Sequence, residues 1–272
     1  MRNERQQDER WRERARTILA RALHARYPAV RGGEAPGAGG PLGRYVWRGK
    51  LLFYRPHTKD LAVIYEVLPK ARSRGAYWVP PVIRPNVILD IGGHIGIASV
   101  YLATLFPTAK IFTFEPVPDN FAILQKNISE YPNIRAFPIA LGKKDGAVEI
   151  HYPDDPANFG GFSFLEAWGD RSRTLTVEMR RAGELLSGLG ITDVDVIKID
   201  AEGAEYDVLT SLDPGVLKRT SWITGELHGE RDFELLAYLS RWFDLGVKKS
   251  LGGRLMNFDA CNKAVAPHLF DK

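Results

Sequence analysis

Short apolar runs alternate with amphipathic stretches along most of this chain, and the alternation predicts strands separated by helices. The apolar runs with the length of buried strands span residues 87–89, 111–114, 134–139, 194–199 and 222–227. Apolar residues recur at helical spacing in segments 97–105, 119–128, 182–189, 204–212 and 233–239. Strands that alternate with helices form a largely parallel sheet with helices on both faces. The sequence therefore predicts an α/β domain with a doubly wound sheet.

Other elements are expected outside this alternation. They are a hairpin over 45–54, a helix over 61–68, a small β insertion with strands at 147–152 and 174–177, and closing strands at 243–247 and 255–258. The hairpin is expected to turn at Arg48 and Gly49. The insertion carries a Gly-rich, aromatic segment, 158–164, between its two strands.

The first 43 residues are set apart by composition as an N-terminal extension, and residues 44–272 form the predicted domain. A basic amphipathic helix is expected over 4–27, followed by a Gly/Pro linker. Residues 1–50 hold 12 Lys and Arg against 5 Asp and Glu, whereas the remainder holds 25 against 28. Because the domain itself is not basic, we expect no nucleic-acid partner. The helix is expected to pack on the domain or to form a homodimer, and an arm that contacts a membrane surface or RNA is the alternative.

The composition also indicates the cellular compartment in which the protein is expected. No apolar stretch approaches the roughly 20 residues of a transmembrane helix, and the charged N-terminus lacks the apolar core of a signal peptide. Cys261 is the only cysteine, so an intramolecular disulfide is impossible, as suits a reducing compartment. These features predict a cytoplasmic protein without a transmembrane segment.

The first core strand ends in a Gly-rich turn with the sequence DIGGHIG, residues 90–96. Glycines let the backbone turn tightly, and the following helix N-terminus offers free N–H groups to an anionic ligand. The spacing is D-x-G-G-x-x-G and not the G-x-G-x-x-G of dinucleotide-binding proteins, which argues against a nicotinamide oxidoreductase. The turn predicts a cofactor site formed by Asp90, Gly92, Gly93, His94 and Gly96.

Residues that follow the next strands are further candidates, because ligands bind at the carboxyl ends of the strands in such sheets. Glu115 ends the second strand, where an acid accepts hydrogen bonds from ribose hydroxyls, with Pro116 and Asn120 beside it. The alternative is that Glu115 binds no ribose and is only an acid at a helix N-terminus, where the helix dipole favours a negative charge. Ala140 and Leu141 follow the third strand and are expected to cover an adenine ring.

Ionisable residues crowd the ends of the fourth and fifth core strands. They are Lys198, Asp200, Glu202, Glu226 and His228. Lys198 and Asp200 share one strand face, because residues two apart point the same way. Clustered ionisable groups at a cleft are candidates for catalysis. The alternative is a structural ion pair between Lys198 and Asp200, with Glu205 capping a helix.

Together these motifs resemble the FkbM family of S-adenosylmethionine-dependent methyltransferases. The resemblance runs from about residue 54 to 228. It is carried by segments 55–60, 89–96, 114–116 with 120–121 and Asn127, 140–142, 197–205 and 226–228. The most specific piece is IKIDAEGAE, residues 197–205, followed by ELH. The resemblance implies a class I methyltransferase fold, which is Rossmann-like, with seven strands of which the last is antiparallel. It also implies S-adenosylmethionine as cofactor and methyl transfer to a hydroxyl of a sugar or natural product. His94 stands where Asn is more frequent.

We expect catalysis to depend on Lys198, Asp200, Glu202 and His228, with Asp200 also near the cofactor. His228 suits the general base, since an unperturbed imidazole has a pKa of about 6.5, whereas Lys198 needs a strongly lowered pKa. Asp60, Phe162 and Glu226 are the expected contacts of a hydroxylated small-molecule acceptor.

The sequence leaves three alternatives. A Mg²⁺ ion held by Asp200 and Glu202 is an alternative way to acidify the acceptor, although we expect no metal. Binding of S-adenosylmethionine without catalysis is a second alternative. Methyl transfer to a nitrogen or carboxylate of a peptide-like metabolite is the third.

Overall fold

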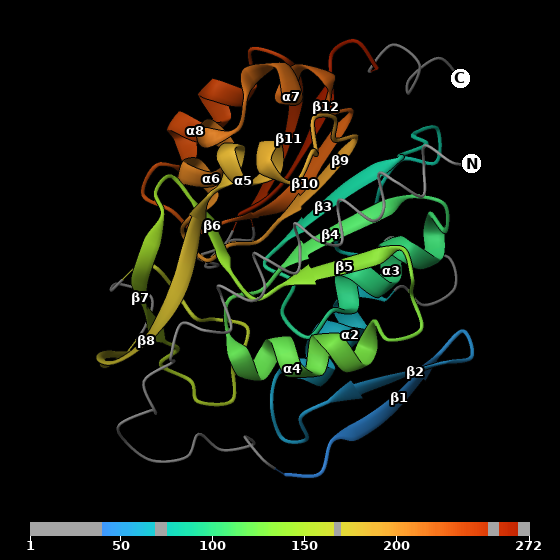
Figure 1. Ribbon diagram of the computed structural model, residues 1–272, viewed down its shortest axis with the longest axis vertical. Helices are drawn as coiled ribbons and strands as arrows, with labels where there is room; N and C mark the ends of the chain where they lie inside the picture. Colours follow the sequence, from blue (N-terminus) through green and yellow to red (C-terminus); the bar gives the residue numbers. More distant parts are fainter. Residues whose placement is uncertain (1–39, 69–74, 166–169, 250–255, 266–272) are drawn as a thin grey trace.

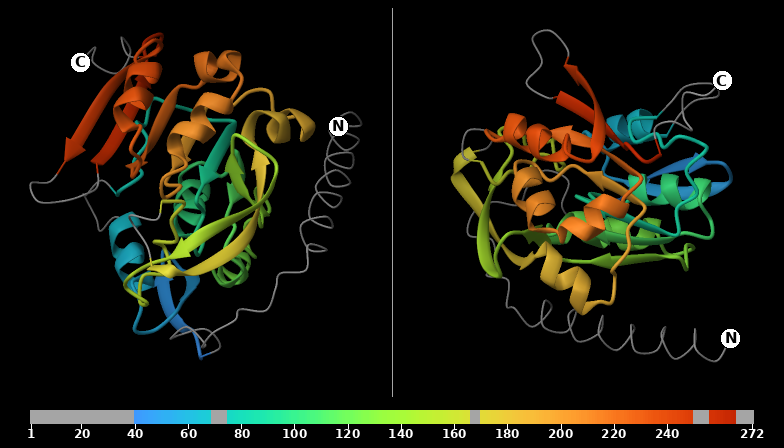
Figure 2. Two further views of the ribbon diagram at one scale, coloured as in Figure 1. Left: turned by 90° about the vertical axis from the view of Figure 1, so that its left-hand side faces the viewer. Right: turned by 90° about the horizontal axis from the view of Figure 1, so that it is seen from above.

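The structure, a computed structural model, describes residues 40–68, 75–165, 170–249 and 256–265. The predicted helix at 4–27 and most of the linker lie outside these residues. A seven-stranded sheet forms the centre of the described part, with helices on both faces (Figures 1 and 2).

The central sheet has the strand order β11–β12–β10–β9–β3–β4–β5. Its strands are β3 (Val87–Ile91), β4 (Lys110–Phe114), β5 (Ile134–Phe137), β9 (Val196–Ile199), β10 (Trp222–Leu227), β11 (Phe243–Lys249) and β12 (Met256–Asn262). Neighbours pair in parallel except on both sides of β12, which is antiparallel to β10 and β11. This confirms the predicted doubly wound, mainly parallel sheet with an antiparallel last strand.

The strand order reverses between β3 and β9. The chain first lays β4 and β5 on one side of β3 and then places β9 and β10 on the other side. Ligands bind at such a switch point, outside the carboxyl ends of the strands. Across it, Asp90 of β3 lies in register with Lys198 of β9.

Seven described helices enclose the sheet. They are α2 (Asp60–Val67), α3 (Ile97–Leu105), α4 (Pro118–Asn127), α5 (Ala182–Gly188), α6 (Glu205–Ser211), α7 (Pro214–Arg219) and α8 (Asp232–Leu239). Alternate strand residues point to opposite faces. Ile88 therefore packs in a cluster with α2 and α3, whereas Leu89 packs in a second cluster with α5, α6 and α8. The helices expected within the described residues are confirmed, and α7 was not predicted.

The predicted hairpin is present as β1 (Gly43–Trp47) and β2 (Lys50–Tyr54). Arg48 and Gly49 at its turn have φ values of 49° and 77°, as a two-residue turn with both φ angles positive requires.

The insertion forms a second sheet of three strands in the order β6–β8–β7. β7 (Gly146–Tyr152) and β8 (Asp170–Arg181) are the two predicted strands, paired antiparallel with Val148 opposite Val177. β6 (Ala140–Gly142) was expected only as the exit from the third core strand, but it pairs in parallel with β8. An apolar run in the sequence predicts that a strand forms, but it does not predict which other strand it pairs with.

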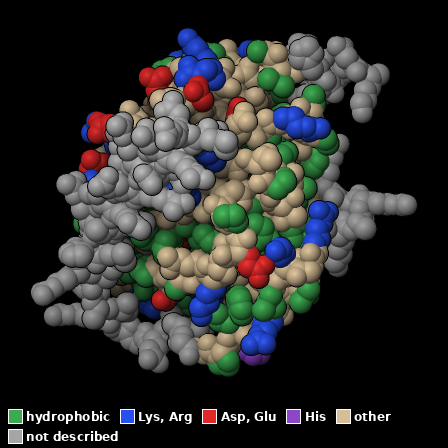
Figure 3. All heavy atoms as spheres, turned by 45° about the vertical axis from the view of Figure 1, so that its right-hand side comes forward, with side chains coloured by type: hydrophobic (Ala, Val, Ile, Leu, Met, Phe, Trp, Pro, Cys, Tyr) green, Lys and Arg blue, Asp and Glu red, His purple; other side chains and the backbone are tan. Residues whose placement is uncertain are grey.

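Figure 3 shows one face on which Lys and Arg side chains are spread among neutral and hydrophobic ones. Within the described ranges, no helix combines the length and the apolar character that crossing a bilayer demands.

Asn127 near the end of α4 joins the hairpin to the Gly-rich turn. Its Oδ1 accepts the Phe53 N–H, and its Nδ2 donates to the carbonyls of Phe53 and Ile95. We expect Asn127→Ala to lower the free energy of unfolding by about 2–4 kcal/mol, because buried backbone groups lose their partners. Urea denaturation measures this, and Gln125→Ala, at an exposed position of α4, should change it by less than about 0.5 kcal/mol. Equal losses in the two variants would contradict the joining role.

Candidate active site

A cavity of 520 Å³ lies at the carboxyl ends of β3, β4, β9 and β10. Its volume falls within the roughly 300–1,000 Å³ typical of small-molecule sites. The predicted site residues that line it are Gly92, Gly93, His94, Glu115, Pro116, Asn120, Ala140, Leu141, Phe162, Lys198, Asp200, Glu202, Glu226 and His228. Asp60, Asp90 and Gly96 do not line it, and the first two are fully buried behind its wall.

The turn after β3 requires glycine at two points. Gly92 has a φ of 79°, and a Cβ there would collide with the backbone carbonyl of Asp200. A Cβ on Gly93 would collide with the Thr113 hydroxyl. Larger residues are therefore excluded at both positions. His94 also takes a left-handed conformation, with a φ of 47°, which a non-glycine residue adopts only at a cost.

Asp90 and Lys198 form a buried ion pair beneath this turn. The Lys198 Nζ lies 3.2 Å from Asp90 Oδ1, with side-chain exposures of 2% and 0%. Lys198 also donates to the carbonyls of Ile91 and Gly92, while the Ser99 hydroxyl donates to the other Asp90 oxygen. The ion pair of Lys198 is thus with Asp90 and fixes the turn.

The charge of Lys198 follows from these neighbours. Burial lowers the pKa of Lys198, but the Asp90 and Asp200 carboxylates outweigh burial and hold the pKa above its usual value. The amine therefore stays protonated. Lys198 does not have the strongly lowered pKa that a lysine needs to act as a general base.

A second buried network supports the turn from the other side. Arg55 donates to both Asp60 carboxylate oxygens, at 2.8 and 3.0 Å, and to Asn120 Oδ1 at 2.7 Å. Its guanidinium also lies 3.9 Å from the centre of the Phe159 ring. His94 Nε2 is 3.3 Å from Asp60 Oδ1, so this network positions His94 from behind. Sequence reasoning missed Arg55, although it begins the quoted motif 55–60.

Glu115 lies at the end of β4 with its carboxylate against the cavity. Its Oε2 accepts the His94 N–H at 2.8 Å, and its Oε1 accepts the Val117 N–H at 2.9 Å. Burial raises the pKa of Glu115, and the hydrogen bonds and the nearby His94 only partly oppose that rise. A carboxylate has about four acceptor positions, so acceptor capacity remains for a ligand hydroxyl.

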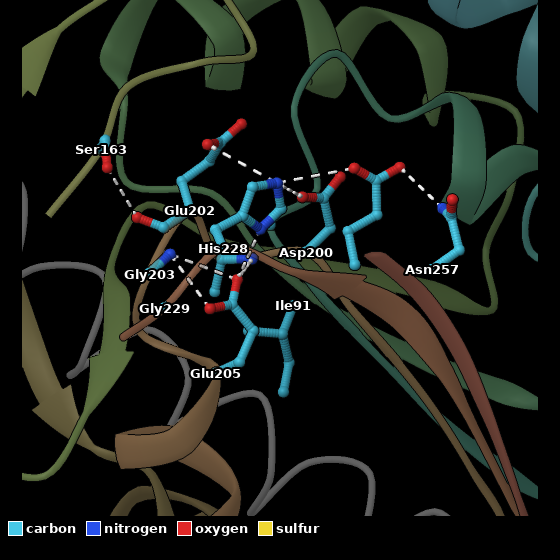
Figure 4. Close-up of polar contacts among 12 residues, drawn as sticks. Ile91, Ser163, Asp200, Glu202, Gly203, Glu205, His228, Gly229 and Asn257 are labelled. Carbon is cyan, nitrogen blue, oxygen red and sulfur yellow. Dashed lines mark hydrogen bonds and ion pairs between the residues drawn. The ribbon is translucent and has the colours of Figure 1, made fainter. Parts of the chain in front are cut away.

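His228 lies at the centre of an acidic cluster after β10 (Figure 4). Its Nδ1 is 3.1 Å from Glu205 Oε1. Its Nε2 is 3.5 Å from Glu226 Oε2 and 3.8 Å from both Asp200 Oδ1 and Glu202 Oε2. The ends of β9 and β10 thus converge, as the sequence predicts for neighbouring parallel strands.

The cluster sets the protonation of its own members. Burial lowers the pKa of His228, but hydrogen bonds to Glu205 and Glu226 and the charge of Asp200 outweigh it and raise the pKa to about 12. Burial raises the pKa of Glu202 to about 8. His228 therefore holds its proton at neutral pH in this arrangement, and an ionised Glu202 is the better proton acceptor.

Tyr77 is a member of the site that sequence reasoning missed. Its hydroxyl donates to Asp200 Oδ2 at 2.9 Å. Burial and the Asp200 charge raise the pKa of Tyr77 well above its usual value, so the hydroxyl remains a donor. Tyr77 lies in an irregular segment before β3, where no periodicity marks it.

The β insertion closes one side of the cavity and holds the turn that carries Glu202. Phe162 packs in a cluster with Ala140 and Ile150. The Ser163 hydroxyl donates to the Glu202 carbonyl at 2.9 Å. Glu202 has a φ of 48°, so its backbone depends on this support.

Comparison with known proteins gives one family and several relatives. Residues 90–255 match the family described as Methyltransferase FkbM domain. The chain is 28% identical over 194 residues to AMB antimetabolite synthetase AmbE of Pseudomonas aeruginosa, 27% over 155 residues to Methyltransferase 1 of Beauveria bassiana, and 24% over 206 residues to 2-O-methyltransferase NoeI of Sinorhizobium fredii. These matches cover 59%, 50% and 71% of this chain. The chain spans 9%, 62% and 84% of the lengths of these relatives.

We expect Lys198→Met to lower the free energy of unfolding by about 3–5 kcal/mol, because it leaves the buried Asp90 carboxylate without its counter-ion. Chemical denaturation measures the loss, and adding Asp90→Asn should restore part of it. Lys143→Met is the control, since Lys143 forms an exposed ion pair with Asp207 and such pairs contribute at most about 1 kcal/mol. A loss no larger than that of the control would show that Lys198 does not brace the turn.

Proposed function

This chain belongs to the FkbM family of methyltransferases, and we propose that it transfers a methyl group from S-adenosylmethionine to a hydroxyl of a sugar or natural-product small molecule. The observation that carries the proposal is the single cavity wall that joins the Gly-rich turn and Glu115 to the acidic cluster around His228. One end of that wall has the chemistry to hold a nucleoside, and the other has the chemistry to accept a proton.

The residues at the first end fit S-adenosylmethionine. Gly92 and Gly93 admit close approach to the backbone, and Glu115 offers acceptors to the ribose hydroxyls. Ala140 and Leu141 provide the apolar wall that an adenine ring needs, and Pro116 and Asn120 flank the ribose position. When bound, this cofactor supplies an electrophilic methyl group, whose bond to sulfur breaks with the electron pair going to sulfur. Asp90 and Gly96 act from behind the wall by shaping the turn.

At the other end, we assign proton acceptance to Glu202. Its side chain is half-buried at the cavity wall, and a pKa of about 8 places it near the pH at which a general base works best. The acceptor hydroxyl gives its proton to the Glu202 carboxylate, and the oxygen electron pair forms the new bond to carbon. Asp200 and His228 fix the geometry and charge around Glu202, and Lys198 acts as a positioning residue through the turn.

The acceptor is proposed to contact Phe162 and Glu226, which line the cavity. Asp60 supports the site through His94, because it is buried behind the wall. Transfer to oxygen is supported by the similarity to NoeI, a 2-O-methyltransferase. Cofactor binding without catalysis, and transfer to a nitrogen or carboxylate, are outcomes that the experiments below distinguish.

We expect Glu115→Ala to weaken binding of S-adenosylmethionine by about 1.5–3 kcal/mol, or roughly 10- to 150-fold, because ribose hydroxyls lose a charged acceptor. Titration calorimetry on the folded variant measures the affinity. Asp119→Asn, an exposed position at the start of α4, should bind like the wild type. Wild-type affinity in Glu115→Ala would refute the ribose assignment.

We expect Glu202→Gln to reduce methyl transfer by at least about 10²-fold, the usual loss when a general base is removed. Melting temperature and cofactor affinity should stay close to the wild type. The assay follows S-adenosylhomocysteine formation with a panel of sugars, hydroxylated metabolites and amino or carboxylate acceptors, and Glu230→Gln, at an exposed position, is the control. If the wild-type protein binds the cofactor but methylates no acceptor in the panel, the non-catalytic alternative is supported.

A further inference from the structure

We infer that Asp200, Glu226 and His228 form a binding site for one divalent metal ion at the acceptor end of the cavity. One potential ligand atom from each residue lies within 4.8 Å of those of the other two. The three residues come from the ends of the neighbouring strands β9 and β10, so the sheet itself fixes their spacing. This set replaces the pair Asp200 and Glu202 that the sequence offered as a metal alternative.

The separations between these atoms are close to those between neighbouring ligands of one ion. His228 Nε2 lies 3.5 Å from Glu226 Oε2 and 3.8 Å from Asp200 Oδ1. Neighbouring ligands of an octahedral ion with ion–ligand distances of about 2.1–2.6 Å are about 3.0–3.7 Å apart. The separation to Glu226 lies within this range and that to Asp200 lies just above it, so an ion fits between His228 and the two carboxylates after a small inward movement.

The other ring nitrogen of His228 is held as metal-binding histidines usually are. Glu205 Oε1 lies 3.1 Å from Nδ1 and also accepts the Ala201 N–H at 2.9 Å. Because this carboxylate acts as an acceptor, Nδ1 carries a hydrogen. An ion that binds displaces the second ring proton, and Nε2 then presents its lone pair to the cavity. A histidine ligand almost always donates its second N–H to such a carboxylate or carbonyl, which fixes its tautomer and orientation.

The two carboxylate ligands are oriented in the same way. Tyr77 donates to Asp200 Oδ2 at 2.9 Å, which leaves Oδ1 on the side of His228. Asn257 of β12 donates to Glu226 Oε1 at 3.4 Å, which leaves Oε2 on the side of His228. Each ligand thus has one polar atom held by a different element and the other turned toward the common centre.

The local charge favours a further cation. The carboxyl groups that gather here belong to Glu66, Asp200, Glu202, Glu205 and Glu226. The nearby buried cation Lys198 is already paired with Asp90. His228 in its charged form supplies one positive charge to this group, whereas a divalent ion supplies two at the point where the carboxylates converge.

Two carboxylates and an imidazole suit Mn²⁺, and Mg²⁺ when more oxygen ligands are added. Three protein ligands leave three positions of an octahedron for water or an acceptor oxygen. The role of the ion rests on the proposed function: a hydroxyl bound to it becomes more acidic and loses its proton to Glu202. Binding of the ion itself does not depend on that function.

The test is a titration of the full chain with Mn²⁺ in the absence of cofactor, followed by electron paramagnetic resonance of free Mn²⁺ and by calorimetry. We expect one ion per chain and at least about tenfold weaker binding in Glu226→Gln, with an unchanged melting temperature. Tyr77→Phe should weaken binding by about tenfold through loss of the Asp200 donor. Glu230→Gln, an exposed acid near β10, should bind like the wild type.

Two outcomes would overturn the site. Wild-type protein that binds neither Mn²⁺ nor competing Mg²⁺ would show that charged His228 alone balances the carboxylates. Binding that is unchanged in Glu226→Gln would place the ion elsewhere. Full methyl transfer by protein treated with a chelator would overturn the role of the ion and leave the methyltransferase proposal standing, whereas loss of transfer that added Mn²⁺ restores would support the role.

Discussion

The buried ion pair between Asp90 and Lys198 is the constraint on which the rest of the site depends. It spans the switch point of the sheet, where β3 and β9 lie side by side, and it holds the Gly-rich turn through the Gly92 carbonyl. A buried pair of this kind adds little net stability, but losing one partner is costly. The pair therefore fixes one arrangement of the two strand ends. Because the cavity wall is built from these strand ends, its shape depends on that arrangement.

Two further networks support the same turn from outside the sheet. Arg55 and Asp60 hold His94 from behind, and Asn127 joins the hairpin to the backbone after the turn. Both networks involve the segment between β2 and α2 or the hairpin before it, which are not part of the central sheet. The β insertion performs the corresponding task at Glu202. Additions to the sheet thus position the residues that the sheet alone would leave on mobile loops.

The electrostatics of the acidic cluster change which residue we expect to act as the general base. An isolated histidine titrates near neutrality, but the carboxylates around His228 raise its pKa to about 12. Burial, with a smaller contribution from the neighbouring carboxylates, raises the pKa of Glu202 to about 8. Residue type alone suggests His228 as the base, whereas the surroundings favour a carboxylate. A cation that enters the cluster would lower the pKa of both groups, because its charge disfavours protonated His228 and favours ionised Glu202.

Much of the fold and the membership of the site could be predicted from the sequence, because both depend on local pattern. Apolar periodicity located the core strands, and the rule that ligands bind at strand ends selected Glu115, Asp200 and His228. Partner choice depends on contacts distant in the chain, so the pairing of β6 with β8 and of Lys198 with Asp90 needed the tertiary structure. Tyr77 joined the site without any sequence signal, since its segment has no periodicity. Protonation was also decided in three dimensions, because a pKa reflects the burial and charges that folding brings together.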